Sequence, residues 1–349
     1  MATIQEAPAS PRAATIHDVA RAAGVAIGTA SKALNGRGKL RTETRARVRA
    51  AAADLGFRPN DLAQSLLRGR TFTAGLLATD QYGRFSLPLV WGIEDALVDA
   101  QFSVFLCNVR DDAERERRHL DSLLAKRVDG IVVVGGRIDP RPPIDLDGGA
   151  AVPVLYVFAQ STDPTALCLI PDDGHGGRLA AEHLVGLGRR RVAHVTGPES
   201  WEAVRRRRDG MLEALAEHGL GCPPRRVRPG RWDAAWGYDA ASQLLDEDRA
   251  IDAIFCGNDR IAHGVVDALR ARGIGVPDDV AVVGFDNHEV VATMVRPPLT
   301  SVDMQLEDLG KLAGRCLLEL IEGRALAGSI RQPCRLVVRE SSGATERQQ

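Results

Sequence analysis

The sequence has few of the features that mark secreted, membrane or metal-binding proteins. Its six cysteines are widely spread with no C-x-x-C pair, which is typical of buried thiols in a reducing compartment and not of disulfides or zinc ligands. No apolar run approaches the roughly 18 residues of a membrane span. Residues 1–14 have neither the basic start nor the apolar centre of a signal peptide, and we predict a disordered tail there. We therefore expect a cytoplasmic protein with no membrane partner, metal or cofactor.

Sequence motifs of enzymes are also missing. His288-Glu289 lacks the second histidine of a zinc protease, because Ala292 stands in its place. Gly310-Lys311 lacks the Ser or Thr that completes a phosphate-binding loop, and no G-x-S-x-G occurs. We therefore expect a binding function and no enzymatic activity.

Charge is unevenly distributed, although the formal net charge is only −1. Residues 15–70 contain eleven lysines and arginines against four aspartates and glutamates, so this stretch carries +7 and the remainder −8. A basic region on an acidic body is typical of proteins that bind a polyanion such as nucleic acid.

The basic region begins with two predicted short helices joined by a tight turn. Thr15 is a suitable N-cap, and Asp18 three residues later completes a capping box. Apolar residues then recur at helical spacing, at Ile16, Val19, Ala20 and Ala23. Gly24 provides the turn, and a second helix is predicted at about Ile27–Leu34. This pattern indicates a helix-turn-helix whose second helix reads a DNA major groove, with a plain helical hairpin as the alternative.

A third helix is predicted over Thr42–Leu55, with Thr42 as its cap and Gly56 at its end. Its apolar side would complete a three-helix core through Val48, Ala51, Ala52 and Leu55. Its outer side carries Arg45, Arg47 and Arg49. These cations strengthen the prediction of a DNA-binding domain.

Pro59 and Asn60 indicate the start of a further helix of only about two turns. A helix this short is marginal by itself, so a partner helix or DNA must order it. Leu66 is a candidate wedge between base steps in a minor groove. The alternative is a linker helix packed on the body, with Leu66 in an ordinary core.

The order of these motifs resembles the headpiece and hinge of the lactose/galactose repressor (LacI/GalR) family of bacterial transcription regulators. The matching segments are D-V-A-x-x-A-G-V, T-x-S-K-x-L-N, T-R-x-x-V, L-G-F-x-P-N and A-x-x-L, and the resemblance continues to about Thr345. It implies operator binding through Thr15, Ile27, Gly28, Thr29, Ser31, Lys32, Asn35, Ala63 and Leu66. A leucine-heptad tail for a four-chain bundle is missing, so we expect a homodimer and, by two-fold symmetry, a palindromic operator.

One position departs from the family pattern. Family members usually have Ser as the N-cap of the second helix, where this chain has Ala26. The loss of a cap typically costs about 1 kcal/mol. Gly28 offers no side chain to a base edge, so we expect major-groove specificity to depend chiefly on Lys32, which as a cation favours guanine.

From Thr73 onward, short apolar runs alternate with amphipathic stretches. Strands are predicted at 74–78, 103–107, 130–134, 152–157, 192–196, 253–256 and 280–284, and helices at 89–100, 113–126, 177–187, 204–218, 236–245 and 260–272. This alternation predicts an α/β body of two doubly wound parallel-sheet lobes, similar to periplasmic binding proteins. After a helix-turn-helix domain at 15–60 and a hinge at 61–72, we expect an effector-binding domain at 73–345, with an N-lobe of about 73–171 and 302–331 and a C-lobe of about 172–299 and 332–345.

Polar and aromatic residues follow the predicted strands, where parallel sheets bind ligands. The family resemblance implies that a small-molecule effector contacts Phe85, Asp172, Arg207, Trp232, Asn258 and Asp286. Each has an ordinary structural alternative: Arg207 could lie on a solvated helix face, Asn258 or Asp286 could cap a helix, and Trp232 could be core.

These residues do not identify the effector. Sugars are the commonest effectors of the family, and purines and nucleosides also occur. By resemblance, the effector changes the angle between the lobes, which melts the hinge helices and lowers the affinity for the operator. In some members of the family the effector instead promotes DNA binding. A sugar receptor without a DNA role is the remaining alternative, and the basic headpiece argues against it.

Overall fold

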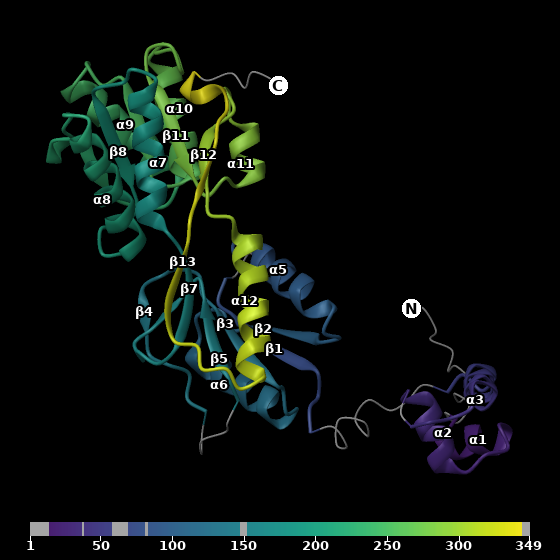
Figure 1. Cartoon of the computed structure of the whole chain (residues 1–349). Coiled ribbons are helices and arrows are strands. Elements are labelled where there is room, and N and C mark those ends of the chain that lie inside the picture. Colours follow the sequence, from purple (N-terminus) through teal and green to yellow (C-terminus); the bar gives the residue numbers. More distant parts are fainter. Residues whose placement is uncertain (1–13, 37, 58–68, 81–82, 147–151, 344–349) are drawn as a thin grey trace, which may run out of the picture. The chain divides into compact units, whose positions relative to one another are not determined.

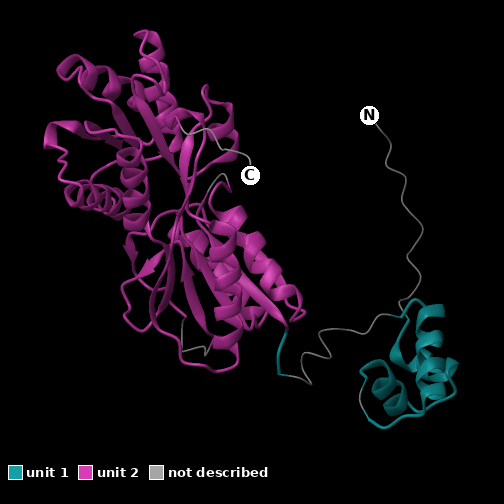
Figure 2. Ribbon diagram, turned by 45° about the horizontal axis from the view of Figure 1, so that its top comes forward, with its two compact units in different colours: residues 1–71 teal, residues 72–349 magenta. Residues whose placement is uncertain are grey.

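The computed structural model describes residues 14–36, 38–57, 69–80, 83–146 and 152–343. The chain divides into two compact units, residues 1–71 and 72–349 (Figure 2). The predicted tail at 1–14 falls almost wholly outside the described residues, as does the predicted hinge helix with Ala63 and Leu66. Within the described part of the chain, none of the helices combines the length and apolar character that crossing a bilayer requires.

The N-terminal unit contains three helices: α1 (Ile16–Ala22), α2 (Ile27–Leu34) and α3 (Thr42–Asp54). The predicted capping box is present, because the side chains of Thr15 and Asp18 each accept a hydrogen bond from the other residue's backbone N–H. Seven small or branched residues form the core: Val19, Ala20, Ala23, Ala30, Ala33, Val48 and Ala52. Alanines let the three helices approach closely, which suits such a small core.

Two details of the predicted third helix are wrong. Arg41, and not Thr42, is the N-cap of α3, and its side chain makes no capping hydrogen bond. Leu55 is 40% exposed instead of buried, because the helix ends at Asp54 and Leu55 is already its C-cap. Phe57, two residues later, packs against the core in its place.

The second unit consists of two lobes, each built on a six-stranded sheet with helices on both faces (Figure 1). The N-lobe sheet has the order β13-β7-β5-β3-β1-β2, and all its pairs are parallel. Its strands are β1 (Thr73–Ala78), β2 (Ser103–Asn108), β3 (Gly130–Val134), β5 (Val154–Val157), β7 (Leu167–Pro171) and β13 (Gly328–Gln332). Helices α5 (Ser86–Val98) and α12 (Leu306–Ile321) pack on one face, and α6 (Ala113–Ala125) packs on the other.

The C-lobe sheet has the order β14-β12-β11-β10-β8-β9, with only the β12–β14 pair antiparallel. Its strands are β8 (Val192–Thr196), β9 (Val227–Pro229), β10 (Ala253–Cys256), β11 (Ala281–Phe285), β12 (Thr300–Asp303) and β14 (Arg335–Val337). Its helices are α7 (Asp173–Gly186), α8 (Glu202–Glu217), α9 (Ala234–Glu247), α10 (Asp259–Ala271) and α11 (Glu289–Met294). The predicted α/β fold with two parallel-sheet lobes is confirmed.

The chain passes between the two lobes three times. The crossings follow β7, β12 and β13, so that α12 returns to the N-lobe and β14 ends in the C-lobe (Figure 1). The second crossing lies beyond Asp303, slightly later than the expected boundary near residue 302, because Thr300–Val302 pair with β11 and Asp303 pairs with Arg335 of β14. The prediction also missed β7, all five of whose residues are buried.

Pairs of glycines set the spacing of the packed helices. A Cβ added at Gly177 of α7 would lie 2.0 Å from the carbonyl oxygen of Arg207, and one added at Gly210 of α8 would lie 2.0 Å from that of Gly174. The same reciprocal arrangement occurs between α5 and α12 at Gly92 and Gly310, and between α9 and α10 at Gly237 and Gly264. The backbones of these helices are therefore in direct contact, and α7 holds α8 and its Arg207 at a defined distance.

Candidate functional site

Helix α2 of the N-terminal unit, the predicted DNA-reading helix, has an exposed face. On α2, Ile27, Gly28 and Lys32 are exposed, whereas Thr29 and Ser31 are half-buried. Asn35 donates a hydrogen bond from its side chain to Ser31 Oγ at 3.3 Å. The face that is free to enter a groove is thus formed by Ile27, Gly28 and Lys32, as expected for a reading helix.

Two arginines of α3 have structural contacts that the sequence did not predict. Arg47 donates from Nε to the carbonyl oxygen of Ala23 at 2.9 Å, at the end of α1. Arg45 donates to the carbonyl oxygens of Gly36 and Gly38, at 3.5 and 3.2 Å. These bonds satisfy backbone oxygens at the end of one helix and in a turn. Both arginines therefore hold the loops of the bundle in addition to adding positive charge.

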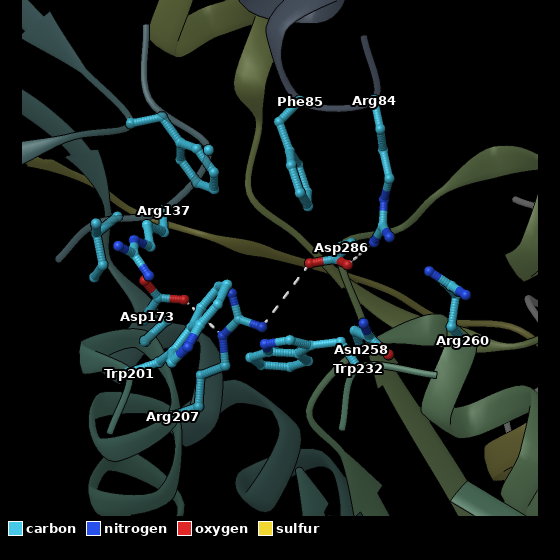
Figure 3. A pocket seen from close by; sticks show the side chains of 14 residues that line it. Arg84, Phe85, Arg137, Asp173, Trp201, Arg207, Trp232, Asn258, Arg260 and Asp286 are labelled. Carbon is cyan, nitrogen blue, oxygen red and sulfur yellow. Dashed lines mark hydrogen bonds and ion pairs between the residues drawn. The ribbon is translucent and has the colours of Figure 1, made fainter. Parts of the chain in front are cut away.

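In the second unit, a cavity of about 160 Å³ opens between the lobes at the carboxyl ends of the strands (Figure 3). The N-lobe contributes side chains that follow β1, β3 and β5, and the C-lobe contributes side chains that follow β8 to β11 and the N-terminal part of α8. The lining residues are Arg84, Phe85, Gly136, Arg137, Ile138, Phe158, Asp173, Trp201, Ala203, Arg207, Trp232, Asn258, Arg260 and Asp286.

A buried ionic network forms the floor of this cavity. Arg207 is only 4% exposed, and it donates to Asp173 Oδ1 from Nε and to the carbonyl oxygen of Gly257 from its terminal nitrogen, both at 2.6 Å. Its guanidinium lies 3.5 Å from the centre of the Phe285 ring and 3.9 Å from Asp286 Oδ1. A buried cation requires such partners, because leaving it unpaired would cost several kcal/mol. The network fixes the orientation of the Arg207 guanidinium at the floor of the cavity.

One ion pair joins the two lobes across the cavity. Arg84, from the loop after β1, donates to Asp286, from the loop after β11 (Figure 3). Burial lowers the pKa of Arg84, and the nearby cations Arg260 and Arg207 lower it further. Burial also raises the pKa of Asp173, and the Arg207 guanidinium opposes that rise. Burial and neighbouring charges therefore shift the pKa values of one charged group from each lobe.

Aromatic rings form the walls. Phe85 and Phe158 of the N-lobe lie with their ring centres 5.1 Å apart, and Trp201 and Trp232 of the C-lobe meet edge to face at 5.6 Å. Flat apolar surfaces beside hydrogen-bonding groups are the usual composition of a small-molecule site. They suit a sugar ring or a planar heterocycle.

Five of the six expected effector residues line the cavity: Phe85, Arg207, Trp232, Asn258 and Asp286. Asp172 is a correction, because it is the N-cap of α7 and accepts a hydrogen bond from His175 N at 3.0 Å outside this cavity. The next residue, Asp173, lines the cavity instead. Asn258 has both roles considered for it, since it lines the cavity and its Oδ1 caps α10 by accepting from Ile261 N at 2.8 Å.

Sequence reasoning missed five large lining side chains: Arg84, Arg137, Phe158, Trp201 and Arg260. A positional signal was present, because Arg84, Arg137, Phe158 and Trp201 lie in the loops that follow β1, β3, β5 and β8. The fifth, Arg260, is the second residue of α10, just after Asn258. All residues that follow the carboxyl ends of the parallel strands should therefore be considered as candidate ligand contacts, whether or not they belong to a recognised motif.

Comparison with known proteins agrees with both units. Residues 15–60 match the model of bacterial regulatory proteins of the lacI family, and residues 181–342 match a periplasmic binding protein-like domain. The ribose operon repressor of Escherichia coli strain K12 is 33% identical over 308 residues, covering 88% of this chain and 93% of the relative. The repressor PurR of Glaesserella parasuis is 32% identical over 309 residues, covering 88% and 90%. A structure of the Lac repressor dimer bound to operator and the anti-inducer ONPF is 29% identical, with a TM-score of 0.77 and coverage of 95% and 100%.

A helix-turn-helix unit joined to a two-lobed body with a cavity between the lobes defines a DNA-binding transcription regulator. The chain belongs to the lacI family of bacterial regulatory proteins. Members of this family regulate transcription by binding DNA and are not enzymes.

Proposed function

We propose that this protein is a repressor that binds a palindromic operator as a homodimer in the cytoplasm, and that a small molecule bound between the lobes controls it. The exposed face of α2 with Lys32 and the basic composition of residues 15–70 support the DNA contact. The dimeric, operator-bound state of the Lac repressor structure supports the assembly. We propose DNA contacts at Thr15, Ile27, Gly28, Thr29, Ser31, Lys32, Asn35, Ala63 and Leu66.

The observation that carries the effector proposal is the cavity between the lobes with an ion pair across it. Arg84 and Asp286 belong to different lobes, so a ligand that inserts between or beside them alters the free energy of one lobe arrangement relative to another. Only such unequal binding to two arrangements can shift an equilibrium. We propose Phe85, Asp173, Arg207, Trp232, Asn258 and Asp286 as effector contacts, with Asp172 withdrawn from the set.

A sugar is the effector class that we favour. Hydroxyls match the charged and amide groups of the cavity floor, and the pyranose face matches the tryptophan and phenylalanine walls. The same walls suit a purine, as the similarity to PurR suggests. Both classes therefore belong in the first ligand screen.

The DNA half of the proposal is tested by selecting duplexes from a random library with the purified full-length protein. We expect an inverted repeat to be enriched, and we expect Lys32→Ala to weaken binding to the selected duplex by about 1–3 kcal/mol. Lys126→Ala, in the second unit, is the control that removes the same charge. Selection of an asymmetric site would contradict two-fold binding.

The effector half is tested by thermal-shift measurements with sugars, sugar phosphates, nucleosides and nucleobases. A ligand that stabilises wild type but not Asp286→Ala, and that changes affinity for the selected duplex, would support the cavity as the control site. Stabilisation that survives in Asp286→Ala and leaves operator affinity unchanged would place the ligand elsewhere and contradict the proposal.

A further inference from the structure

The cavity between the lobes contains more positive than negative charge. Four arginines and two aspartates line it, which gives a net charge of +2. Asp286 is paired with Arg84, and Asp173 is paired with Arg207. In the part of the chain that the structure describes, the other two arginines, Arg137 and Arg260, have no carboxylate within 4.0 Å. The excess charge therefore rests on two guanidinium groups, one from each lobe.

Arg260 occupies a position that is unfavourable for a cation. It is the second residue of the 13-residue helix α10, whose N-terminus carries partial positive charge. Its neighbour Asp259 does not neutralise it, because that carboxylate is fully buried and accepts hydrogen bonds from Ser301 Oγ at 2.6 Å and His288 N at 2.7 Å. Arg260 points into the cavity on the side of Arg84 and Asp286 (Figure 3). The N-terminus of α10 and Arg260 thus add positive potential beside the Arg84–Asp286 ion pair at one end of the cavity.

Buried polar atoms without partners show that the cavity wall is built for a polar ligand. Asp173 is 0% exposed, and its Oδ2 has no hydrogen-bond partner among the described residues. The same holds for the Trp232 indole N–H and for Nε of Arg84. Buried groups of this kind are normally satisfied, so each marks a position where a ligand atom would gain a hydrogen bond. One acceptor and two donors are available in this way.

We propose that the effector is an acid: a polyhydroxylated molecule with one anionic group, carboxylate or phosphate, that binds against Arg260 and Arg84. Its hydroxyls would meet Asp173 and the Trp232 N–H, and its carbon skeleton would lie between the aromatic walls. This inference rests on the proposed function, since it names the class of effector for the same cavity.

The first test compares each acid with its neutral parent by titration calorimetry on the full-length protein. The panel contains uronates, aldonates and sugar phosphates of five and six carbons, with the corresponding neutral sugars and with inorganic phosphate and sulfate. We expect at least one acid to bind roughly 10- to 100-fold more tightly than its neutral parent, the factor that a charge-assisted hydrogen bond supplies. Preference for a uronate or aldonate identifies a carboxylate, and preference for a sugar phosphate identifies a phosphate.

Two results of this titration would overturn the inference. One is that no acid in the panel binds more tightly than its neutral parent. The other is that inorganic phosphate or sulfate binds as tightly as the acids, which would indicate an adventitious ion only. Neutral sugars that bind and alter operator affinity would leave the proposed function standing while the acid inference fails.

Variants then locate the anionic group. Arg260→Gln should weaken acid binding roughly 10- to 100-fold and leave neutral-sugar binding within about threefold. Arg270→Gln is the matched control, because it removes an exposed arginine from the last turn of the same helix. A larger loss in Arg137→Gln than in Arg260→Gln would contradict the assignment to Arg260, and equal losses in Arg260→Gln and Arg270→Gln would show that only overall charge matters.

Discussion

At the scale of single residues, adjacent aspartates at the start of α7 have different tasks. Asp172 lies outside the helix and caps it, whereas Asp173 is the first helical residue and turns inward to Arg207. One step along the chain rotates a side chain by about a quarter turn or more, so it decides between solvent and cavity. The sequence D-D alone does not reveal which carboxylate meets the ligand.

Asp173→Asn should weaken effector binding by about 10- to 100-fold, because the amide cannot neutralise Arg207 and the guanidinium loses its orientation. Calorimetry with the ligand found in the screen measures the effect. Asp172→Asn should bind normally, since asparagine caps helices as well as aspartate does. If Asp172→Asn lost binding and Asp173→Asn did not, the assignment of the two residues would be reversed.

The uncapped start of α2 is the second feature at this scale. Ala26 has extended backbone angles, φ −70° and ψ 150°, that a capping residue requires, but its methyl accepts no hydrogen bond. Ala26→Ser should stabilise α2 by about 1 kcal/mol. Hydrogen exchange of the amides in residues 27–34 of the full chain would then slow about fivefold, with α3 unchanged as the internal reference. Unchanged exchange in α2 would mean that the cap contributes nothing here.

At the scale of elements, helix pairs are locked by glycines that touch the facing backbone. Gly210→Ala should destabilise the second unit by about 1–3 kcal/mol or more, because its Cβ would press on the backbone of Gly174 and push α8 from α7. Gly186→Ala is the matched control in α7, where an added Cβ meets nothing within 4 Å. It should stabilise by about 0.5–1 kcal/mol. Urea unfolding measures both, and equal effects would contradict the account of helix spacing.

A buried histidine in the β8–β10 pair makes stability depend on pH. His194 stacks on Phe255 at 4.7 Å between ring centres, and its Nδ1 lies 2.9 Å from the Phe255 carbonyl oxygen. Burial lowers the pKa of His194 to about 4, whereas in the unfolded chain it is about 6.5. The unfolded state therefore binds more protons between these values, so this contribution is present above pH 6.5 and is lost as pH falls toward 4.

The size of this contribution is on the order of 3 kcal/mol. Urea unfolding of wild type and His194→Gln between pH 4.5 and 7.5 should give a shallower acid branch for the variant. The difference in slope is the readout, because a loss of packing lowers the free energy of unfolding by the same amount at every pH. Parallel curves would show that His194 does not titrate between the folded and unfolded states.

At the scale of the whole molecule, large apolar side chains remain exposed on the N-lobe. β2 is an edge strand on which Phe105 and Leu106 are 43% and 48% exposed, and Trp91 of α5 is 57% exposed. Exposed apolar groups on an edge strand and a neighbouring helix are typical of a surface that another protein covers. We propose that this surface contributes to the dimer.

Leu106→Glu should therefore shift the protein toward monomer and weaken operator binding, because two headpieces must act together on two half-sites. Sedimentation analysis gives the mass, and the selected duplex gives the affinity. Leu187→Glu, at an exposed leucine of the C-lobe, is the control that should remain a dimer. A dimeric Leu106→Glu protein would exclude this surface from the interface.

The amino-acid sequence by itself determined the local structure and the family. The capping box at Thr15 and the apolar spacing of α1 act within a few residues, and alternating strands and helices follow from periodicity that can be read along the chain. The motifs of the headpiece identified the regulator, and residues after the strands pointed to the cavity. These patterns involve residues that are close in the sequence, so they can be recognised without knowledge of the fold.

Only the tertiary structure decided which of those residues meet. Arg84 and Asp286 are 202 positions apart and pair because two sheets place their carboxyl ends on opposite sides of one cavity. Leu55 is exposed because α3 ends at Asp54, one residue before the predicted end. At the start of α7, Asp172 is the N-cap and Asp173, one residue later, is the buried aspartate. Strand order and helix packing depend on many weak contacts between segments that are far apart in the sequence. A local sequence pattern does not contain the information for such contacts.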